Sequence, residues 1–404
     1  MARETTAVPQ LSLVALTTLF LRFGLLAWGG PVAQIAMIRR SLVDDQRWIP
    51  AERFNRTLAV YQVLPGPEAQ ELCIFFGMAS RGRLGGVLAG LAFLAPGFLL
   101  MLGLGWFYVE VGIDSPLFAA AFAGCQAAVM AIIVRGVHRL ANRSLRDDGW
   151  LWAIAAGAFV ATLAGVYFVI PLAAGGIAYL ARQRGHQVIA AALLAAMLVG
   201  VVGLALASGR LIDPRIESSS EDRAAFTARA DSSDLLVTGV KAGVLTFGGA
   251  YTAIPFVQDD AVRQNGWLTN SEFLDGLALS GIIPAPLVIF ATFVGYVAGG
   301  VWGAVAITVG IFLPAFVITL LGHRYLEAAV ANPRLHAVLD GVTAGVIGLV
   351  AATAIPLAAT ALTTLPAFAI FGVALATLYI WRAGMAVAMV VVAGGVAGLL
   401  VFAS

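Results

Sequence analysis

Five polar side chains interrupt long apolar stretches of this 404-residue chain: Arg22, Gln62, Glu68, Glu71 and Lys241. Lys241 is the only lysine, and it stands 219 positions after Arg22 (241 − 22). A charge inside an apolar segment normally faces the interior of the protein, and two cations there would suit a doubly charged anion. The alternative is that both long side chains extend to a polar boundary with their stems along apolar surface.

Glu68 and Glu71 are three residues apart, so both carboxylates would lie on one face of a helix. Carboxylates at a helix N-terminus commonly act as caps. The functional alternative is a proton-coupling site or a counter-charge to Arg22, with Gln62 orienting a bound anion. The positions 219 residues after Gln62, Glu68 and Glu71 hold Gly281, Leu287 and Phe290, so we expect the polar chemistry mainly in the first half.

Two proline-rich motifs interrupt apolar segments at matched positions. Pro65, Gly66 and Pro67 form the first motif, and Pro284 and Pro286 belong to the second. Proline lacks an N–H group and clashes with the preceding turn, so a helix cannot continue through either motif. A new helix after Pro67 or Pro286 would present its N-terminus, a natural anion site, to the break. The alternative is a plain kink, but breaks in both halves of a chain favour a transport site.

Two glycine pairs, Gly29-Gly30 and Gly248-Gly249, lie near the ends of matching apolar segments. Glycine pairs allow two helices to approach closely, or a helix to unwind locally. Their shared position suggests that they lie beside the proline motifs.

All these features belong to one internal duplication. The same offset of 219 positions relates the glycine pairs, the prolines, and Trp48 to Trp267 (248 − 29, 284 − 65, 267 − 48). We therefore expect two homologous repeats, at 1–185 and 235–404. The segment 186–234 would hold a linking transmembrane helix and a polar linker.

The composition is that of a membrane protein. Hydrophobic residues make up 60% of the chain and charged residues 11%, and the mean hydropathy is +0.93. Soluble domains carry about 25% charged residues. The apolar stretches are long and continuous, so we predict an all-α polytopic fold lying in the lipid bilayer. Neither a metal, a cofactor nor a nucleic-acid partner is expected, and without an ATPase segment transport would use gradients.

The predicted spans number about thirteen: 11–37, 56–79, 84–111, 116–136, 150–166, 167–182, 186–208, 235–257, 273–297, 299–321, 335–356, 362–380 and 384–403. Six spans per repeat plus the linking helix make the second repeat inverted relative to the first. The positively charged loops favour a cytoplasmic N-terminus, but the arginines of 39–56 oppose it. A re-entrant 56–80 segment would resolve this conflict and would also change the parity.

Several motifs resemble the chromate ion transporter family, in its long two-domain form. They are Phe23-Gly24, Gly29-Gly30-Pro31, Gln62-Val63-Leu64-Pro65-Gly66-Pro67, Phe247-Gly248-Gly249-Ala250-Tyr251 and Thr292-Phe293-Val294-Gly295-Tyr296. The resemblance implies a carrier that exports chromate across the bacterial inner membrane, with two domains of opposite orientation. Gln34 stands where this family usually has histidine.

The sequence thus predicts a secondary active transporter of a tetrahedral oxyanion, most simply a chromate exporter. Sulfate or another oxyanion, moved in either direction, is the alternative, and a homodimer is left open. An enzyme would need a nucleophile–base pair or metal ligands, which the motifs do not supply.

Overall fold

The protein is described here by a computed structural model covering residues 8–62, 64–112, 115–208, 229–247, 249–330, 332–381 and 385–403. Across these ranges it is built from helices, which confirms the predicted all-α class. Four of the described helices are long and apolar enough to cross a membrane, and they start at Glu68, Pro116, Leu287 and Pro333. The predicted linker lies mostly outside the described residues, as does Gly248.

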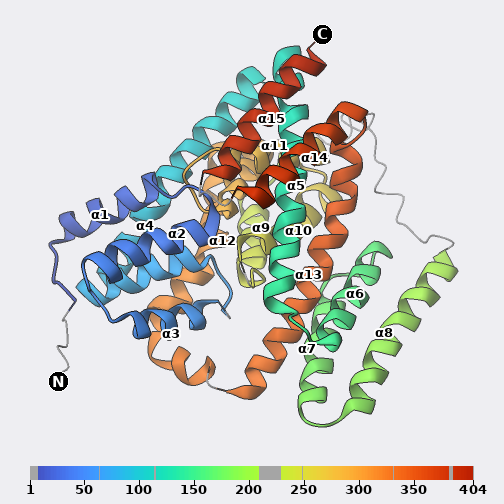
Figure 1. The fold of residues 1–404 in the computed structure, drawn as a ribbon, viewed down its shortest axis with the longest axis horizontal. Coiled ribbons are helices and arrows are strands. Elements are labelled where there is room, and N and C mark those ends of the chain that lie inside the picture. The colour runs from blue at the N-terminus through green and yellow to red at the C-terminus, as the bar shows by residue number, and fades with distance from the viewer. Residues whose placement is uncertain are drawn as a thin grey trace.

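The first repeat begins with three short helices and continues with longer ones (Figure 1). Its elements are α1 (Leu13–Leu25), α2 (Gly30–Arg39), the π-helical turn η1 (Arg40–Asp45), α3 (Ala51–Tyr61), α4 (Glu68–Phe107), η2 (Tyr108–Gly112), α5 (Pro116–Ser144), α6 (Gly149–Leu163) and α7 (Val169–Gln183). The next helix, α8 (Gln187–Ser208), has no counterpart among the described elements of the second repeat.

The second repeat follows the same order of elements. They are α9 (Ser232–Val244), η5 (Ala250–Ala253), α10 (Ile254–Gln258), η6 (Asp259–Gln264), α11 (Asn270–Gly281), η7 (Leu287–Ile289), α12 (Phe290–Val330), α13 (Pro333–Ala361), α14 (Leu365–Ile380) and α15 (Ala386–Phe402). Even the π-helical turn recurs, since η1 and η6 are 219 positions apart (259 − 40). The duplication is therefore a repeat of structure as well as of sequence.

The helices α4 and α12 are each folded back on themselves. Gly82 and Gly300 adopt left-handed backbone angles (φ 61° and 67°) that end one arm and start the next. Across the first turn, Gln70 donates to the carbonyl of Gly90 at 2.8 Å. Across the second, the hydroxyls of Thr292 and Thr308 are 2.7 Å apart. Each element is therefore a tight helical hairpin.

Several predicted spans are not continuous helices. The segment 56–79 is divided, because α3 ends at Tyr61 and α4 starts at Glu68. The segments 11–37, 235–257 and 273–297 are interrupted in the same way at the glycine pair or the prolines. The first arm of α4, 68–80, is about 20 Å long at 1.5 Å per residue, too short for a hydrocarbon core of about 30 Å. The predicted helix breaks are confirmed, whereas the predicted count of about thirteen spans is not confirmed by the described residues.

The same close contact packs the first helix of each repeat. A Cβ at Gly24 would lie 2.4 Å from the carbonyl oxygen of Phe93, so α1 touches the backbone of α4. A Cβ at Gly243 would lie 2.4 Å from the carbonyl oxygen of Ile311, so α9 touches α12 in the same manner. Small residues permit this approach, which drives helix association in lipid.

The repeats exchange their last helices. In the first repeat α5 packs against α14 and α15 of the second, while α13 of the second packs against α6 and α7 of the first (Figure 1). Glycines make both contacts close: a Cβ at Gly124 would lie 2.0 Å from the Gly394 carbonyl oxygen, and one at Gly341 2.4 Å from that of Gly175. Neither repeat therefore buries its core alone.

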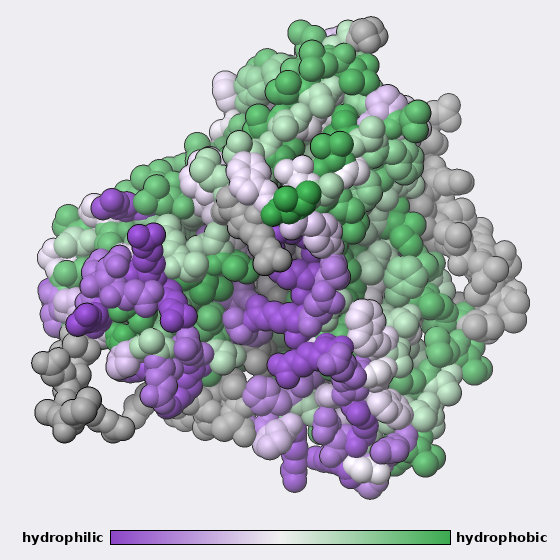
Figure 2. Space-filling view, viewed as in Figure 1, coloured by the Kyte–Doolittle hydropathy of each residue, from purple (hydrophilic) through white to green (hydrophobic). Residues whose placement is uncertain are grey.

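The surface separates into polar and apolar regions. Figure 2 shows hydrophilic side chains in the lower part of the view, over α2, α3 and the lower end of α5, and hydrophobic ones around α15 and along α8. Large apolar side chains are almost fully exposed on the outer helices, including Val188, Leu365 and Leu400. Exposed apolar side chains along outer helices are typical of surfaces that face lipid, which agrees with a polytopic membrane protein.

Candidate functional site

The helix breaks of the two repeats meet inside the molecule. Gly66 donates its backbone N–H to the carbonyl of Thr246 at 2.9 Å, and Pro65 forms an isolated antiparallel bridge with Phe247. The first proline break thus lies beside the segment that leads into the second glycine pair.

The second break is tied to the first repeat by a side chain. The amide nitrogen of Gln34 donates to the carbonyls of Ala27 (2.9 Å) and Ala285 (3.0 Å), and Gln34 is only 1% exposed. The proline break around Ala285 therefore lies against α2 and the segment before Gly29-Gly30. Each break lies near the glycine segment of the other repeat, an arrangement that sequence alone did not reveal.

A cationic cavity of about 390 Å³ opens at the start of α2. Its walls come from α2, α5, η5, α14 and α15, and among its lining residues are Gly29, Pro31, Arg135, Arg139 and Tyr251. The cavity therefore lies between the two repeats and contains residues of both.

The local sequence explains the shape of this cavity wall. Gly29 and Gly30 have φ values of 89° and 77°, a left-handed backbone that other residues rarely adopt. Pro31 follows inside the first turn of α2, where its missing N–H costs nothing. The next N–H groups of this first turn have no partner within the helix, so the helix end bears a partial positive charge.

Two arginines add full charges to this helix end. Arg135 and Arg139 are four residues apart on α5 and line the same cavity. Guanidinium groups bind oxyanions with paired hydrogen bonds, and helix N-termini add N–H donors. The cavity can therefore hold a small oxyanion. In the sequence these two arginines stand at the end of an apolar segment, where arginines indicate only the topology of the chain and not a binding site.

The carboxylates after the first break are fully enclosed. Glu68 is 3% and Glu71 0% exposed, and both lie in the first turn of α4. Neither carboxylate oxygen of Glu71 has a hydrogen-bond partner among the described residues, and neither does Oε2 of Glu68. Gln62 is half-buried at the end of α3. Glu68 and Glu71 thus form a polar pair in the interior, directly after the proline motif.

The second break is apolar, as its sequence indicated. Pro284 and Pro286 lead into the short turn η7, whose residues Val288 and Ile289 are buried. The methyl group of Ala285 packs close to Gly97 on α4. A helix N-terminus is therefore present after Pro286, but aliphatic side chains surround it.

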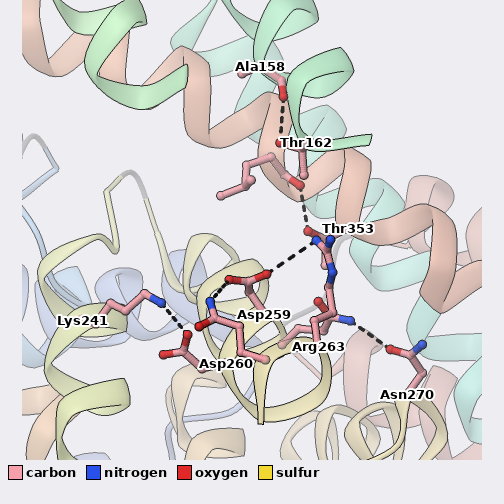
Figure 3. A network of polar contacts seen from close by, with 11 residues as sticks. Ala158, Thr162, Lys241, Asp259, Asp260, Arg263, Asn270 and Thr353 are labelled. Atoms are coloured by element: carbon pink, nitrogen blue, oxygen red, sulfur yellow. Dashed lines mark hydrogen bonds and ion pairs between the residues drawn. The ribbon is translucent and has the colours of Figure 1, made fainter. Parts of the chain in front are cut away.

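The two predicted cations are placed differently from one another. Arg22 is exposed on α1. Lys241 makes an ion pair with Asp260 (Figure 3). Asp260 also accepts a hydrogen bond from Thr238 at 3.0 Å. The ring of Phe168 lies 4.6 Å from the Lys241 ammonium. Lys241 thus contributes to the packing of α9 against η6, and its predicted role in anion binding stays a prediction, as does that of Arg22.

A second cavity of about 260 Å³ occupies the equivalent place in the other repeat. Ile132 and Gly136 of α5 line the first cavity. Leu349 and Thr353 line the second, and they lie at the same distances from the start of α13 as Ile132 and Gly136 do from the start of α5 (349 − 333 equals 132 − 116). Thr162, Asp259 and Arg263 also line it, and Asp259 and Arg263 are ion-paired at 3.5 Å (Figure 3). The first cavity has two arginines, whereas this one has an arginine beside an aspartate.

Comparison with known proteins places the chain among transporters. The model of the chromate transporter family matches residues 14–213 and again 233–399, one match for each repeat. A chromate transport protein of Pseudomonas aeruginosa is 52% identical over 98% of this chain and 95% of its own. One of Cupriavidus metallidurans is 32% identical over 90% of this chain and 87% of its own.

No solved structure matches the chain. The family match covers both repeats, and proteins of this family are transporters and not enzymes. This multi-pass membrane protein therefore belongs to the chromate transporter family, in its long two-domain form.

Proposed function

We propose that this protein is a secondary active transporter that exports chromate from the cytoplasm across the bacterial inner membrane. The observation that carries the proposal is the cavity at the start of α2, where Arg135 and Arg139 meet a helix N-terminus. Chromate is a tetrahedral dianion, and two guanidinium groups with backbone N–H donors match its charge and its oxygens. The names of the relatives support the choice of substrate.

Transport would proceed by alternating access between the repeats. Each repeat has a cavity at the equivalent place, and the repeats are joined through their helix breaks. Such breaks are where secondary transporters bind their substrates. The glycine pairs would permit the movement, and Gln62, Glu68 and Glu71 would adjust charge near the first break. We propose that the repeats are inverted, with thirteen crossings that include the discontinuous segments.

The driving force would be an ion gradient or the membrane potential. Exchange of the last helices between repeats means that one repeat cannot move without displacing helices of the other. A movement that opens one cavity would therefore be coupled to a change at the second. This coupling is what alternating access requires.

Everted membrane vesicles test this function directly. Vesicles containing the protein should accumulate chromate faster than vesicles without it, because everted vesicles turn export into uptake. Excess sulfate, a tetrahedral dianion of similar shape, should compete. Equal uptake by both vesicle types would exclude chromate export, and uptake into right-side-out vesicles alone would reverse the direction.

The orientation of the repeats needs a separate experiment. Single cysteines in 39–56 and in 210–234 should differ in their reaction with an impermeant thiol reagent according to the side of the membrane that they face. A cysteine-free background is obtained by replacing Cys73 and Cys125. A further cysteine in 258–275, the segment that matches 39–56 at the offset of 219, tests the orientation itself, and reaction of these two matched segments from the same side would contradict inversion.

A further inference from the structure

A group of buried oxygen atoms next to the first break has no hydrogen-bond partners among the described residues. It comprises both carboxylate oxygens of Glu71, the hydroxyl of Tyr61 and the hydroxyl of Thr319. All three residues are at most 1% exposed. Buried polar atoms are nearly always paired in folded proteins, so several orphaned oxygens in one region indicate that something binds there.

These residues come together from three elements. Tyr61 is the last residue of α3, Glu71 lies in the first turn of α4, and Thr319 is on the second arm of α12. The Tyr61 and Thr319 hydroxyls lie close enough to interact with one another, and Tyr61 is within electrostatic range of Glu71. The Glu71 carboxylate is therefore the group whose oxygens lack any donor among the described residues.

Gly66 of the proline motif lies between Glu71 on α4 and the second arm of α12. A Cβ there would lie 3.1 Å from Oε1 of Glu71 and 3.0 Å from the methyl group of Ala315, which is one turn before Thr319. The proline break, Glu71 and α12 thus surround one small volume.

The charge in this group is uncompensated. The charged residue that acts on Glu71 is a second carboxylate, Glu68, whereas Glu68 itself has Arg143 nearby. A buried, ionised carboxylate without a partner is strongly destabilising. One positive charge at Glu71 would remove that cost.

The backbone adds to the preference for a cation. The C-terminal end of α3 points at the break and bears a partial negative charge. Pro65 has no N–H to donate to the carbonyl of Tyr61, four residues earlier, so this part of the helix ladder is open. Carbonyls of unwound helices, together with carboxylate and hydroxyl oxygens, are the ligands that bind sodium ions and protons in secondary transporters.

We propose that Glu71, Tyr61 and Thr319 form the binding site of the coupling cation, a proton or a sodium ion. This inference rests on the transport function proposed above. Binding of the cation neutralises Glu71 and holds α3, α4 and the second arm of α12 together around the break. Gly66, which lies beside Glu71, is hydrogen-bonded to Thr246. A movement of the first break on cation binding would therefore also displace the segment before the glycine pair of the second repeat.

The test uses the purified full chain in proteoliposomes at a clamped membrane potential. Chromate uptake is measured with a pH gradient alone, with a sodium gradient alone, and with neither. One of the two gradients should raise the wild-type rate about tenfold, within the usual range of coupling between sites. The gradient that acts identifies the cation.

Glu71→Gln should lose this acceleration while its affinity for chromate changes by less than about threefold, since it removes the coupling charge and not the anion site. Glu52→Gln is the matched control, because Glu52 is exposed on α3 and pairs with Arg56 on the surface. Thr319→Val and Tyr61→Phe keep the shape of the site, and each should raise the cation concentration needed for half-maximal uptake. These two variants keep the test valid where Glu71→Gln does not fold.

The outcomes separate this inference from the transport function. Wild-type protein that moves no chromate under any condition contradicts the function. Wild-type protein that moves chromate while all three variants respond to gradients normally contradicts the cation site. A direct measurement needs no chromate: the driving cation should raise the unfolding temperature of wild-type protein and leave that of Glu71→Gln unchanged.

Discussion

Gly66 and Thr246, from different repeats, are joined by a backbone hydrogen bond of 2.9 Å. The duplicated positions are Ala285 and Ala27 (285 − 66 and 246 − 27 both equal 219), and these two carbonyls are joined by the amide of Gln34 instead. The same junction between the repeats is therefore built twice, once from backbone and once through a side chain. The side-chain version is the one that a substitution can remove.

Gln34 should be essential for stability. Gln34→Leu would leave the carbonyls of Ala27 and Ala285 without donors, at a cost of about 1–3 kcal/mol each. Gln34→Glu should be worse, because it places a carboxylate against two carbonyl oxygens. Gln34→His retains one N–H donor and should be the mildest change. Unfolding temperatures of the purified variants in detergent would show this order, and equal values for all three would contradict the bridging role.

The arginines of the first cavity should control anion affinity. Arg135→Gln removes hydrogen bonds from a charged donor, worth about 1.5–3 kcal/mol, so chromate should bind about tenfold more weakly or worse. Arg135→Lys keeps the charge but not the planar fork, and should lie between wild type and Arg135→Gln. Arg53→Gln, a position on α3 away from this cavity, is the control. Chromate affinity would be measured by equilibrium binding, and an unchanged value in Arg135→Gln would remove the cavity from the mechanism.

Arg22 offers a contrasting test, because it was identified from its place in an apolar segment and is exposed in the structure. If Arg22 binds the anion, Arg22→Gln should abolish chromate uptake in everted vesicles while the protein remains folded. If its side chain only reaches a polar boundary, uptake should stay near the wild-type rate. Comparison with Arg139→Gln in the same assay decides which arginines the anion uses.

The first helical hairpin depends on close backbone contact at Gly77. A Cβ there would lie 2.4 Å from the carbonyl oxygen of Gly85, so Gly77→Ala should destabilise the protein by about 1–3 kcal/mol through overpacking. A Cβ added at Gly103, on the second arm of α4, would meet no atom within 4 Å, so Gly103→Ala should be neutral or stabilising by up to about 1 kcal/mol. Similar thermal stability of the two variants would contradict the hairpin packing.

Asp148 should make stability depend on pH. It lies before α6, outside the membrane-spanning segments, where it accepts hydrogen bonds from Trp150 N–H and Tyr179 and pairs with Arg182. Partial burial raises the pKa of Asp148. The hydrogen bonds from Arg182, Trp150 and Tyr179 together lower the pKa by more than burial raises it, so the net pKa is below the ordinary 3.8.

A lowered pKa in the folded state means that the ionised carboxylate stabilises the fold. This contribution is complete above about pH 4, the unfolded value, and is lost as the pH falls through the lower folded value. Asp148→Asn should therefore be about 1 kcal/mol less stable than wild type at pH 7, as for a partly exposed ion pair. The difference should shrink toward about pH 3. A difference in unfolding free energy that stays constant with pH would exclude this role.

The class of the protein, its duplication and the positions of its helix breaks could all be predicted from composition and spacing along the chain. These are local properties: apolar length decides that a segment lies in lipid, and proline or paired glycine ends a helix wherever it lies. Glu68 and Glu71 were identified for the same reason, because a carboxylate in an apolar segment is rare.

Which residues meet across the two repeats became clear from the packing of the helices. Gln34 reaches Ala285 across 251 positions, and Arg135 on α5 lines a cavity with Tyr251 of the other repeat. The exchange of terminal helices between repeats, which places α14 and α15 beside α5, depends on glycine contacts far apart in the chain. Spacing along one segment contains no information on such partners, since the surface that a helix covers is set by packing against helices from elsewhere.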